Sequence, residues 1–237
     1  MISLCITTYR RDSLLFESFR QVLNDERVSE IVICDDFSPP HFMEAIQAFC
    51  QHPKIKLYRN AKNLGCYRNK AEAVRKASNE WVYLLDSDNV ITPECIDVLY
   101  RYNVSNGWER NTILAPEFAW PTFDYRAFSG VTLSRENVRN YVNQKRFDCL
   151  INTANYFFHR DEYLKRHDPG IEPWTADTIL TNYNWLKAGG YIHVLPGLQY
   201  FHRTDDFKGE EGSHYVANVK KTNGLAKKIE QRLLKLR

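Results

Sequence analysis

The sequence predicts an α/β fold built around a mostly parallel β-sheet. In the first hundred residues, short apolar segments rich in β-branched residues alternate with segments of helical periodicity. Alternation at this spacing is typical of βαβ units, whose strands run parallel. The length of 237 residues suits one large domain.

Each expected strand is a run of apolar and β-branched residues: ISLCITT (2–8), EIVIC (30–34), IKLYR (55–59) and WVYLL (81–85). The segments between and after them show helical periodicity and are expected to form helices at residues 12–23, 41–50, 66–78 and 92–103. In parallel sheets, ligands bind outside the carboxyl ends of the strands. The residues that follow each strand are therefore the candidates for a functional site.

Three of the four strand ends carry polar residues. They read TTY at 7–9, DDFS at 35–38 and DSD at 86–88. The third strand leads into RNAKNLGCYRNK, residues 59–70, which suits a loop that enters a helix with a cationic first turn. Carboxylates and an arginine at one sheet edge describe a polar cleft for a ligand that has both hydrogen-bond donors and negative charge.

Asp86 and Asp88 are separated by one residue at the end of an apolar strand. Two like charges a few ångströms apart repel each other, by about 1 kcal/mol even in water. A divalent cation with oxygen ligands would hold them together. The alternative is structural, because Asp is also common in turns and helix caps after strands. No GxGxxG or GxxxxGK[ST] motif occurs, so phosphates would have to be held by a metal.

Charge and cysteine content exclude several classes of protein. The formal net charge is +3, and residues 216–237 contribute +6 of it (seven Lys or Arg against one Glu), which leaves −3 for the rest. The body therefore gives no reason to expect a nucleic-acid partner. The six cysteines form no CxxC pair, which favours reduced, buried thiols over a disulfide framework or zinc site.

The first residues, MISLCITTYRRDS, are predicted to form a strand and a turn. They contain neither a basic leader nor a long apolar run, so the sequence indicates no signal peptide and no transmembrane helix. A cytoplasmic location is the expectation.

Four motifs, taken in order and spacing, resemble the nucleotide-binding half of family 2 glycosyltransferases: TTY, VICDDFS, NLGCYRNKA and YLLDSDN. The resemblance covers residues 1–100 strongly and 150–203 more weakly, and it implies the GT-A fold, with a Rossmann-like, mixed but mostly parallel central sheet flanked by helices. It also implies a single domain over residues 1–237, made of a nucleotide-sugar-binding half (1–104), an acceptor-binding half (105–212) and a basic C-terminal helix (213–237).

The resemblance implies that Thr7, Tyr9 and Asp36 hold the base of a nucleotide, commonly uridine. The chemistry agrees, because a carboxylate can accept the uracil N3 proton and a tyrosine ring can stack on a flat base. Arg68 would reach the base or the phosphates as a fixed cation. The alternative for Arg68 is a solvated charge on the helix.

The paired carboxylates match the DxD motif of that family. There the last Asp, here Asp88, ligates Mn²⁺ or Mg²⁺, and the first, Asp86, contacts the ribose or a metal-bound water. GT-A enzymes often add a late histidine to the same metal, which would be His202. A lone histidine is more often structural, and the neighbouring Arg203 could serve the phosphates instead.

The catalytic base of that family is usually the Asp of an ED pair that opens a helix in the acceptor half. The matching position is Asp177, with Ala176 where the Glu would stand. The structural alternative is an acidic residue in a first helical turn, which the helix dipole favours. Glu172 and Asp161 are the other candidate carboxylates.

Two further segments each leave two interpretations open. The segment EFAWPTFDYRAFSG could line a sugar site or pack under a long loop, and its aromatic residues are Trp120, Phe123, Tyr125 and Phe128. The C-terminal segment has one apolar helical face surrounded by Lys and Arg, formed by Leu225, Ile229, Leu233 and Leu236. Such a helix could lie on a membrane surface as a peripheral contact, pack on the body of the protein, or contact another domain.

The sequence thus predicts a metal-dependent, inverting glycosyltransferase of the hexosyltransferase type. The donor would be a nucleoside-diphosphate sugar, with UDP favoured, and the acceptor a hydroxyl group on a glycan or glycolipid. Inversion follows from the family and not from any spacing in the chain. Two alternatives stay open: an inactive sugar-nucleotide binding module, suggested by Ala176, and a sugar-phosphate nucleotidyltransferase, although TTYRRDS lacks the glycine-rich loop typical of such enzymes.

Overall fold

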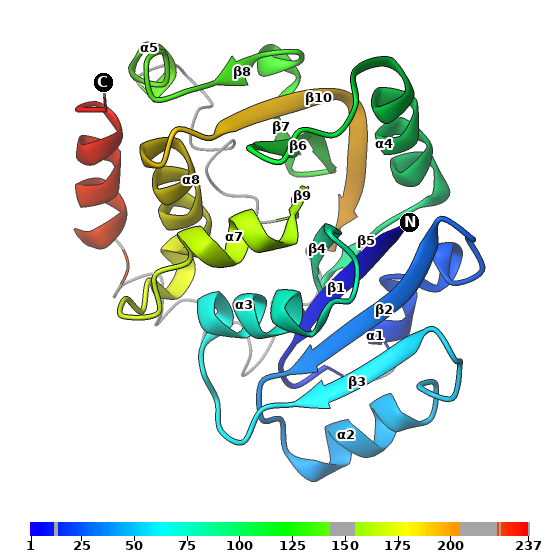
Figure 1. Ribbon diagram of the computed structural model, residues 1–237. Helices are drawn as coiled ribbons and strands as arrows, with labels where there is room; N and C mark the ends of the chain where they lie inside the picture. Colours follow the sequence, from blue (N-terminus) through cyan, green and yellow to red (C-terminus); the bar gives the residue numbers. More distant parts are fainter. Residues whose placement is uncertain (12–13, 143–154, 204–221, 223, 237) are drawn as a thin grey trace.

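The computed structural model describes residues 1–11, 14–142, 155–203, 222 and 224–236 (Figure 1). Its strands are β1 (Ile2–Thr8), β2 (Val28–Asp35), β3 (Ile55–Arg59), β4 (Trp81–Asp86), β5 (Asn89–Val90), β6 (Thr112–Trp120), β7 (Phe123–Asp124), β8 (Thr132–Leu133), β9 (Phe157–His159) and β10 (Tyr191–His202). Its α-helices are α1 (Leu14–Glu17), α2 (Pro40–Gln47), α3 (Cys66–Lys76), α4 (Pro93–Asn106), α5 (Arg139–Val142), α7 (Arg160–Arg166) and α8 (Asp177–Lys187). Short 3₁₀ turns cover Arg20–Val22, Arg126–Phe128 and Trp174–Ala176, and a C-terminal helix covers residues 224–233.

The strands form one mixed sheet in the order β3-β2-β1-β4-β9-β6-β10-β5, with β7 beside β6 and β8 beside β10. β3, β2, β1 and β4 pair with one another in parallel, and β6 pairs in parallel with β10. β9 runs antiparallel between β4 and β6 and joins the two parallel parts. The α/β fold with a mixed, mostly parallel sheet is confirmed. All four predicted strands of the first hundred residues are present.

Two hydrophobic cores lie on the two faces of the sheet, because successive strand residues point to opposite sides. In β4, Val82 and Leu84 face one core, while Tyr83 and Leu85 face the other. The first core is covered by α3, α7, α8 and the C-terminal helix, and the second by α1, α2 and α4 (Figure 1). The alternation of residues along each strand therefore determines which core a side chain joins, and the helices cover both faces of the sheet.

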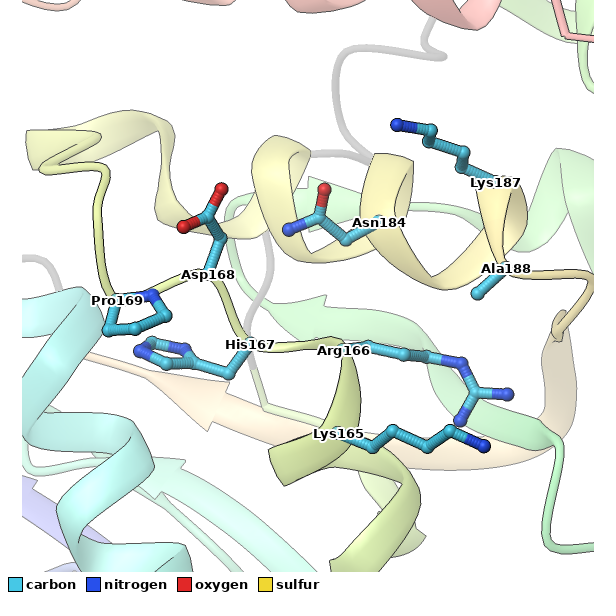
Figure 2. A pocket seen from close by; sticks show the side chains of 8 residues that line it. All are labelled: Lys165, Arg166, His167, Asp168, Pro169, Asn184, Lys187 and Ala188. Carbon is cyan, nitrogen blue, oxygen red and sulfur yellow. The ribbon is translucent and has the colours of Figure 1, made fainter.

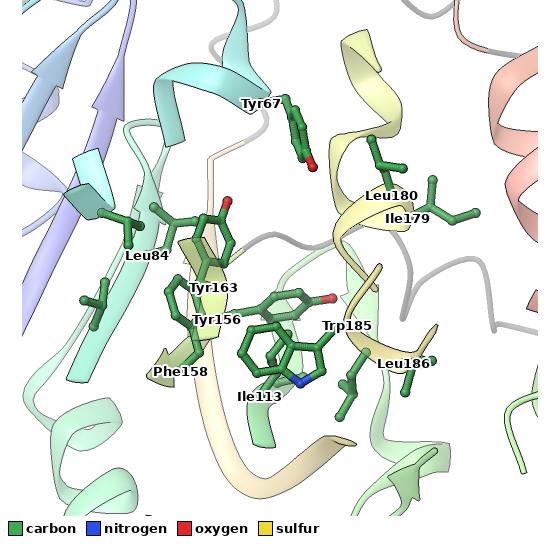
Figure 3. Close-up of a cluster of buried hydrophobic side chains, with 14 of the residues drawn as sticks. Tyr67, Leu84, Ile113, Tyr156, Phe158, Tyr163, Ile179, Leu180, Trp185 and Leu186 are labelled. Atoms are coloured by element: carbon green, nitrogen blue, oxygen red, sulfur yellow. The ribbon is translucent and has the colours of Figure 1, made fainter. Parts of the chain in front are cut away.

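The core on the α8 side is rich in aromatic side chains (Figure 3). Trp185 and Phe158 are completely buried, and Phe158 stacks on Tyr163 with ring centroids 4.4 Å apart. These three residues come from α8, β9 and α7. This core therefore fixes α8, whose first residue is Asp177, to the central sheet.

The helix expected at residues 12–23 is wrong as a single helix. The described part contains the short helix α1 and a separate 3₁₀ turn, joined by i→i+3 bonds such as Ser18 N to the Leu15 carbonyl at 3.1 Å. The Leu14 carbonyl, which a continuing α-helix would bond to residue 18, accepts a hydrogen bond from Arg203 Nη1 at 3.0 Å. A contact with a residue far along the chain thus interrupts the local helical pattern.

The C-terminal helix packs on the body of the protein, which was one of the three interpretations left open. Ile229 and Leu233 are buried in the same core as α8, and Leu225 and Leu236 pack against it. The apolar face that a membrane-surface helix would need is therefore covered. No helix within the described ranges combines the length and apolarity that crossing a bilayer requires.

The cysteines are described at five positions, and all five thiols are free. Cys5, Cys34 and Cys95 are buried, as expected, whereas Cys50 is half-buried and Cys66 is exposed. Cys149 lies outside the described residues. The expected reduced thiols are thus found, but burial is not uniform.

The buried carboxylate of Glu30 stabilises the fold when it is ionised. It accepts hydrogen bonds from Ser3 Oγ, from Ser78 N and Oγ, and from the Lys56 ammonium. Burial alone would raise the pKa of Glu30, but these bonds outweigh it and hold the pKa below the usual 4.5. The ionised form therefore stabilises the fold above pH 4.5, and this contribution is lost as the pH falls through the lowered pKa.

We expect Glu30→Gln to lower the free energy of unfolding by about 1 to 3 kcal/mol at pH 7, because buried donors lose a charged acceptor. Urea unfolding at pH 7 and pH 4 measures this, and the gap between wild type and variant should narrow at pH 4. Glu17→Gln is the matched control, since the Glu17 side chain is 44% exposed and forms an ion pair with the neighbouring Arg20. An equal effect of both substitutions would contradict the prediction.

Candidate functional site

The candidate site lies at the carboxyl ends of β1, β2 and β4, where the sequence predicted it. β4 ends at Asp86, and Ser87 and Asp88 follow in a turn whose backbone is held by other parts of the chain. Asp86 N donates to Asn155 Oδ1 at 2.8 Å, and Ser87 N donates to the Thr7 carbonyl at 3.2 Å. The turn is therefore held before any ligand binds.

Arg203 fixes the same turn from the end of β10. Its Nη2 donates to the Ser87 carbonyl at 2.6 Å, while its Nε and backbone N donate to the Asp88 carbonyl at 3.2 and 3.1 Å. A further bond joins Nη2 to Ser18 Oγ at 3.1 Å. The interpretation of Arg203 as a phosphate ligand is therefore less favoured than a role in holding the aspartate turn.

The Asp88 carboxylate is only loosely neutralised. Arg11 Nη2 lies 3.8 Å from Asp88 Oδ2, which is a long ion pair. Burial and then repulsion by Asp86 raise the pKa of Asp88 to about 6, against the opposing effects of Arg11 and Lys70. The charge of Asp88 is therefore incompletely compensated, which favours an added cation at this turn.

Lys70 joins the two halves of the chain. Its Nζ, on α3, lies 2.6 Å from Asp177 Oδ2 and 3.0 and 3.1 Å from the two oxygens of Asp86. Burial alone would lower the pKa of Lys70, but Asp177 and Asp86 raise it well above its usual value. One buried ammonium thus contacts both the first aspartate of the turn and the candidate base.

Asp177 is the first residue of α8 and is buried, with 7% of its surface exposed. Its backbone carbonyl accepts a hydrogen bond from Thr181 Oγ1 at 2.8 Å, as expected early in a helix. A cap exposed to solvent would not need the ammonium of Lys70. The contact with Lys70 therefore brings Asp177 to the predicted site, in addition to its place at a helix start.

Asp36, the second residue of the DD pair, is buried and holds the loop before α3. Its carboxylate accepts hydrogen bonds from Leu64 N at 2.8 Å, Gly65 N at 2.9 Å and Asn60 Nδ2 at 2.9 Å. Burial raises the pKa of Asp36 and these bonds partly oppose it. Asp35 instead bonds Ser38 within its own turn.

Thr7 and Tyr9 follow β1 toward the same site. Thr7 Oγ1 donates to Asp86 Oδ1 at 3.2 Å. The Tyr9 ring is 37% exposed, with the Arg10 guanidinium 5.1 Å from its centroid. Phe37, which the sequence did not single out, is 45% exposed beside Asp36. Two accessible rings therefore lie near Asp36, the carboxylate that the resemblance assigns to the base.

Arg68 does not share the position of Lys70, although the two are close in sequence. Arg68 is half-buried, and within the described residues nothing accepts a hydrogen bond from its Nε. Its charge lowers the pKa of Glu172, whereas burial, the larger effect, raises it. Arg68 is thus close to Glu172, while Lys70 contacts Asp86 and Asp177.

The two alternative base candidates differ in their surroundings. Glu172 Oε1 accepts a hydrogen bond from Trp174 N at 3.2 Å, and its carboxylate lies so close to Gly65 that a Cβ there would be 2.7 Å from Oε2. The Asp161 side chain is 53% exposed and pairs with Arg160 at 3.0 Å. Glu172 therefore lies beside the loop held by Asp36, whereas Asp161 is on the surface of α7.

His202, the predicted third metal ligand, ends β10 opposite Asn89 of β5. Its Nδ1 lies 3.1 Å from Thr122 Oγ1, and its ring stacks on Phe123 with centroids 5.1 Å apart. Burial lowers the pKa of His202 and the charge of Asp86 raises it, so the two residues are within electrostatic reach.

The side chains that could hold Mn²⁺ or Mg²⁺ at this site are Asp86, Asp88 and the more distant His202. In the part of the chain that the structure describes, no three His, Cys, Asp or Glu side chains are grouped as metal ligands. Asp86 and Asp88 nevertheless fit, because Mg²⁺ is commonly held by one or two carboxylates together with substrate phosphates. The role of His202 as a third ligand stays a prediction.

Some aromatic residues of the segment at 117–130 are packed in the core, and one of them is exposed. Tyr125 and Phe128 are buried, and Phe123 is half-buried between His202 and Tyr125, so the packing interpretation holds for these residues. Trp120 is 45% exposed, and its Nε1 donates to Gln199 Oε1 at 3.2 Å. Trp120 therefore remains the residue of this segment that could contact a sugar.

A cavity of about 480 Å³ lies between the ends of α7 and α8 (Figure 2). Its lining includes Lys165, Arg166, His167 and Lys187. Arg166 Nη2 is bonded to Asn111 at 2.9 Å and its guanidinium lies 4.4 Å from the Trp185 ring, while His167 stacks on Tyr67 at 4.1 Å. These contacts explain the positions of Arg166 and His167 by packing, and we assign the cavity no ligand.

Three residues of the site were missed by sequence reasoning: Lys70, Asn155 and, in its structural role, Arg203. Each acts through a contact with a residue distant in sequence, such as the 116 positions between Arg203 and Ser87. The segment NLGCYRNKA did indicate cations at the start of α3, and this signal could have included Lys70.

Comparison with known protein families gives a clear match. The family model described as glycosyl transferase family 2 matches residues 3–166. Abequosyltransferase RfbV of Salmonella typhimurium is 29% identical over 107 residues, covering 43% of this chain and 32% of that protein. Uncharacterized protein MT1568 of Mycobacterium tuberculosis is 30% identical over 102 residues, with the same coverage. The chain thus spans about a third of the length of these curated relatives.

Solved structures resemble the whole described fold. S. aureus TarS 1-349 in complex with UDP-GlcNAc has a TM-score of 0.65 at 14% identity, covering 98% of this chain and 78% of that one. GalNAc-T7 with UDP, GalNAc and Mn²⁺ has a TM-score of 0.66 at 15% identity, covering 93% of this chain and 48% of that one. At such identities the likeness is one of fold, and the GT-A fold is confirmed.

Proposed function

Because the chain belongs to glycosyl transferase family 2, we propose that it moves a sugar from a nucleoside-diphosphate donor to a hydroxyl group of a glycan or glycolipid acceptor. A UDP-sugar is the favoured donor, since TarS and GalNAc-T7 have been solved with UDP or a UDP-sugar. We further propose a single domain with a donor half (1–104), an acceptor half (105–212) and a C-terminal element (213–237).

One observation carries the proposal: carboxylates from both proposed halves meet at a single buried ammonium. Lys70 Nζ contacts Asp86, at the end of a donor-half strand, and Asp177, at the start of an acceptor-half helix. A transferase needs a donor site and a base for the acceptor within reach of one reacting carbon. This juxtaposition supports transfer over simple binding.

In the proposed reaction, Asp177 accepts the proton of the acceptor hydroxyl as its oxygen attacks the anomeric carbon of the sugar. The new carbon–oxygen bond forms while the bond to the diphosphate oxygen breaks, and the nucleoside diphosphate leaves with the electron pair. A single base of this kind implies inversion at the anomeric carbon. The sugar transferred would be of the hexose type.

The proposed roles of the donor-half residues agree with the positions described above. Tyr9 offers a ring to the nucleotide base, Asp36 a carboxylate oxygen to its N3 proton, and Arg68 a cation near the same loop. Thr7 orients Asp86 through its hydroxyl. Asp86 and Asp88 would hold a divalent cation, with His202 as a further ligand, and this cation would offset the negative charge of the leaving diphosphate.

The inactive binding module remains the second candidate because of Ala176. This residue stands where the family usually carries Glu, and it is buried in the core. A nucleotidyltransferase is less favoured, since the family model matches the greater part of the chain.

The test is a panel of nucleotide sugars incubated with the protein and Mn²⁺, with release of the free nucleotide as the readout. We expect release from UDP-sugars above all, faster in the presence of a glycan or glycolipid acceptor. Binding of UDP without any release would favour the inactive module. Pyrophosphate release from UTP and a sugar phosphate would favour the nucleotidyltransferase.

A further inference from the structure

Lys70 makes a contact that the proposed reaction does not by itself require. Its side chain is 6% exposed, and its ammonium is shared between Asp86 and Asp177, which lie at the ends of different elements. The contact with Asp177, at 2.6 Å, is shorter than the contacts with Asp86, at 3.0 and 3.1 Å. One cation thus serves two carboxylates that have different proposed tasks.

A divalent cation and the Lys70 ammonium would compete for Asp86. Both are positive, and like charges at contact distance repel each other strongly in a partly buried site. A cation that binds Asp86 therefore weakens the bond from Lys70 to that residue. The ammonium keeps a partner, because Asp177 already accepts its shortest bond.

We propose that Lys70 is a positioning residue that links cation binding at Asp86 to the orientation of the candidate base Asp177. In the metal-free protein the ammonium is divided between both carboxylates. When a divalent cation takes Asp86, the ammonium bonds Asp177 alone and fixes it for the acceptor hydroxyl. This inference rests on the proposed function, since it assumes that Asp86 receives a cation and that Asp177 acts as a base.

The simpler alternative is that Lys70 only neutralises two buried carboxylates and so supports the fold. That role predicts a loss of stability when Lys70 is replaced, but no gain in metal affinity. The proposal predicts a gain, because removing a competing positive charge favours the added cation. The sign of the change in metal affinity therefore separates the two.

The first experiment is calorimetric titration of the full chain with MnCl₂ in the absence of nucleotide. We expect Lys70→Met to bind Mn²⁺ more tightly than wild type, on the order of tenfold, and Lys70→Arg to stay near the wild-type affinity. Lys76→Met is the matched control, because Lys76 lies on the same helix with its ammonium 5.2 Å from the Tyr58 ring centroid. Equal affinities of wild type and Lys70→Met would overturn the proposal.

Asp177→Asn provides a second variant that keeps Lys70 in place. Without the Asp177 charge, the ammonium bonds Asp86 alone, so Mn²⁺ must displace a stronger contact. We expect several-fold weaker Mn²⁺ binding, although in the proposal Asp177 is not a metal ligand. An unchanged Mn²⁺ affinity of Asp177→Asn would contradict the proposed link, even if Lys70→Met failed to fold.

A double-mutant cycle measures whether Lys70 acts through Asp177 in transfer at saturating Mn²⁺. We expect the double variant Lys70→Met/Asp177→Asn to be no slower than Asp177→Asn alone, since the positioned group is already lost. Losses that multiply would indicate independent roles and overturn the proposal.

The Mn²⁺ titrations distinguish a failure of this inference from a failure of the proposed function. Tighter Mn²⁺ binding by Lys70→Met in a chain that transfers no sugar would support competition at Asp86 and contradict the proposed function. If Lys70→Met binds Mn²⁺ as wild type does, and the wild-type chain transfers sugar, only the proposed role of Lys70 is contradicted and the proposed function stands.

Discussion

Asp177→Asn is expected to lower sugar transfer by on the order of 10² to 10⁴, the usual cost of losing a general base. Donor binding at saturating Mn²⁺ should stay within a few-fold of wild type. The substitution keeps the shape of the side chain but removes the charge that accepts a proton. Because Asp177 is buried and bonded to Lys70, its loss acts at the contact between the proposed halves and not on the surface.

The measurement is donor affinity by calorimetry and transfer by nucleotide release, both on one preparation. Asp161→Asn is the matched control, since Asp161 is exposed and pairs with Arg160. Thermal unfolding checks that the variant is folded, because Lys70 then has one carboxylate fewer. A parallel loss of donor affinity and transfer would make Asp177 a structural residue of the helix start. Unchanged transfer would direct the search for the base to Glu172.

The donor half was predictable because its signals are local. Strand and helix periodicities alternate, and each strand ends on polar residues that parallel pairing must bring to one edge. The same logic predicts Asp36, Asp86 and Asp88 at one edge of the sheet. It failed at residues 12–23, where the Leu14 carbonyl bonds Arg203, 189 positions away. No local pattern can indicate such a contact.

The choice between Arg68 and Lys70 shows a second limit. The sequence indicated a cation at the start of α3. Arg68 and Lys70 are two positions apart, so their side chains are separated by about 200° around the helix axis. Which of the two faces the sheet edge depends on how α3 packs, and that depends on α7 and α8. The partner that makes Lys70 distinctive, Asp177, is 107 positions away. The resemblance gives Arg68 a role at the base or the phosphates, which stays a prediction, but local motifs did not indicate the contact that Lys70 makes.

The exposure of individual side chains is a third property that sequence patterns do not predict. In the aromatic segment, Tyr125 and Phe128 are buried while Trp120 is exposed, although all three look alike as candidates for stacking on a sugar. In the C-terminal helix, Ile229 and Leu233 are buried in the core beside α8. Amphipathic periodicity indicated a helix with one apolar face, but the surface that covers this face is a matter of tertiary packing.

Asp88→Asn is expected to reduce transfer by on the order of 10² to 10³, comparable to the loss of one group that stabilises developing charge. Mn²⁺ affinity should fall in parallel, because the variant retains one carboxylate of the proposed pair. The backbone of the turn should persist, since Arg203 bonds the main-chain carbonyl of Asp88 and not its side chain.

The metal-free variant should unfold at the wild-type temperature or slightly above it. Asp88 has Arg11 as a distant partner at 3.8 Å and is repelled by Asp86, so removing its charge relieves repulsion in the absence of a cation. Calorimetry with MnCl₂, thermal unfolding in EDTA and nucleotide release measure the three expectations. Asp97→Asn is the control, because Asp97 lies on α4, away from the aspartate turn, and pairs with Arg27.

The metal interpretation depends on the combination of these results. Loss of transfer with loss of Mn²⁺ affinity and preserved folding is the outcome expected of a ligand. If Asp88→Asn transfers sugar at the wild-type rate, or if EDTA leaves the wild-type enzyme fully active, the paired carboxylates do not hold a required cation. Asp88 would then be a structural residue of the turn, and side-chain cations such as Lys70, Arg68 and Arg11 would offset the charge of the leaving diphosphate.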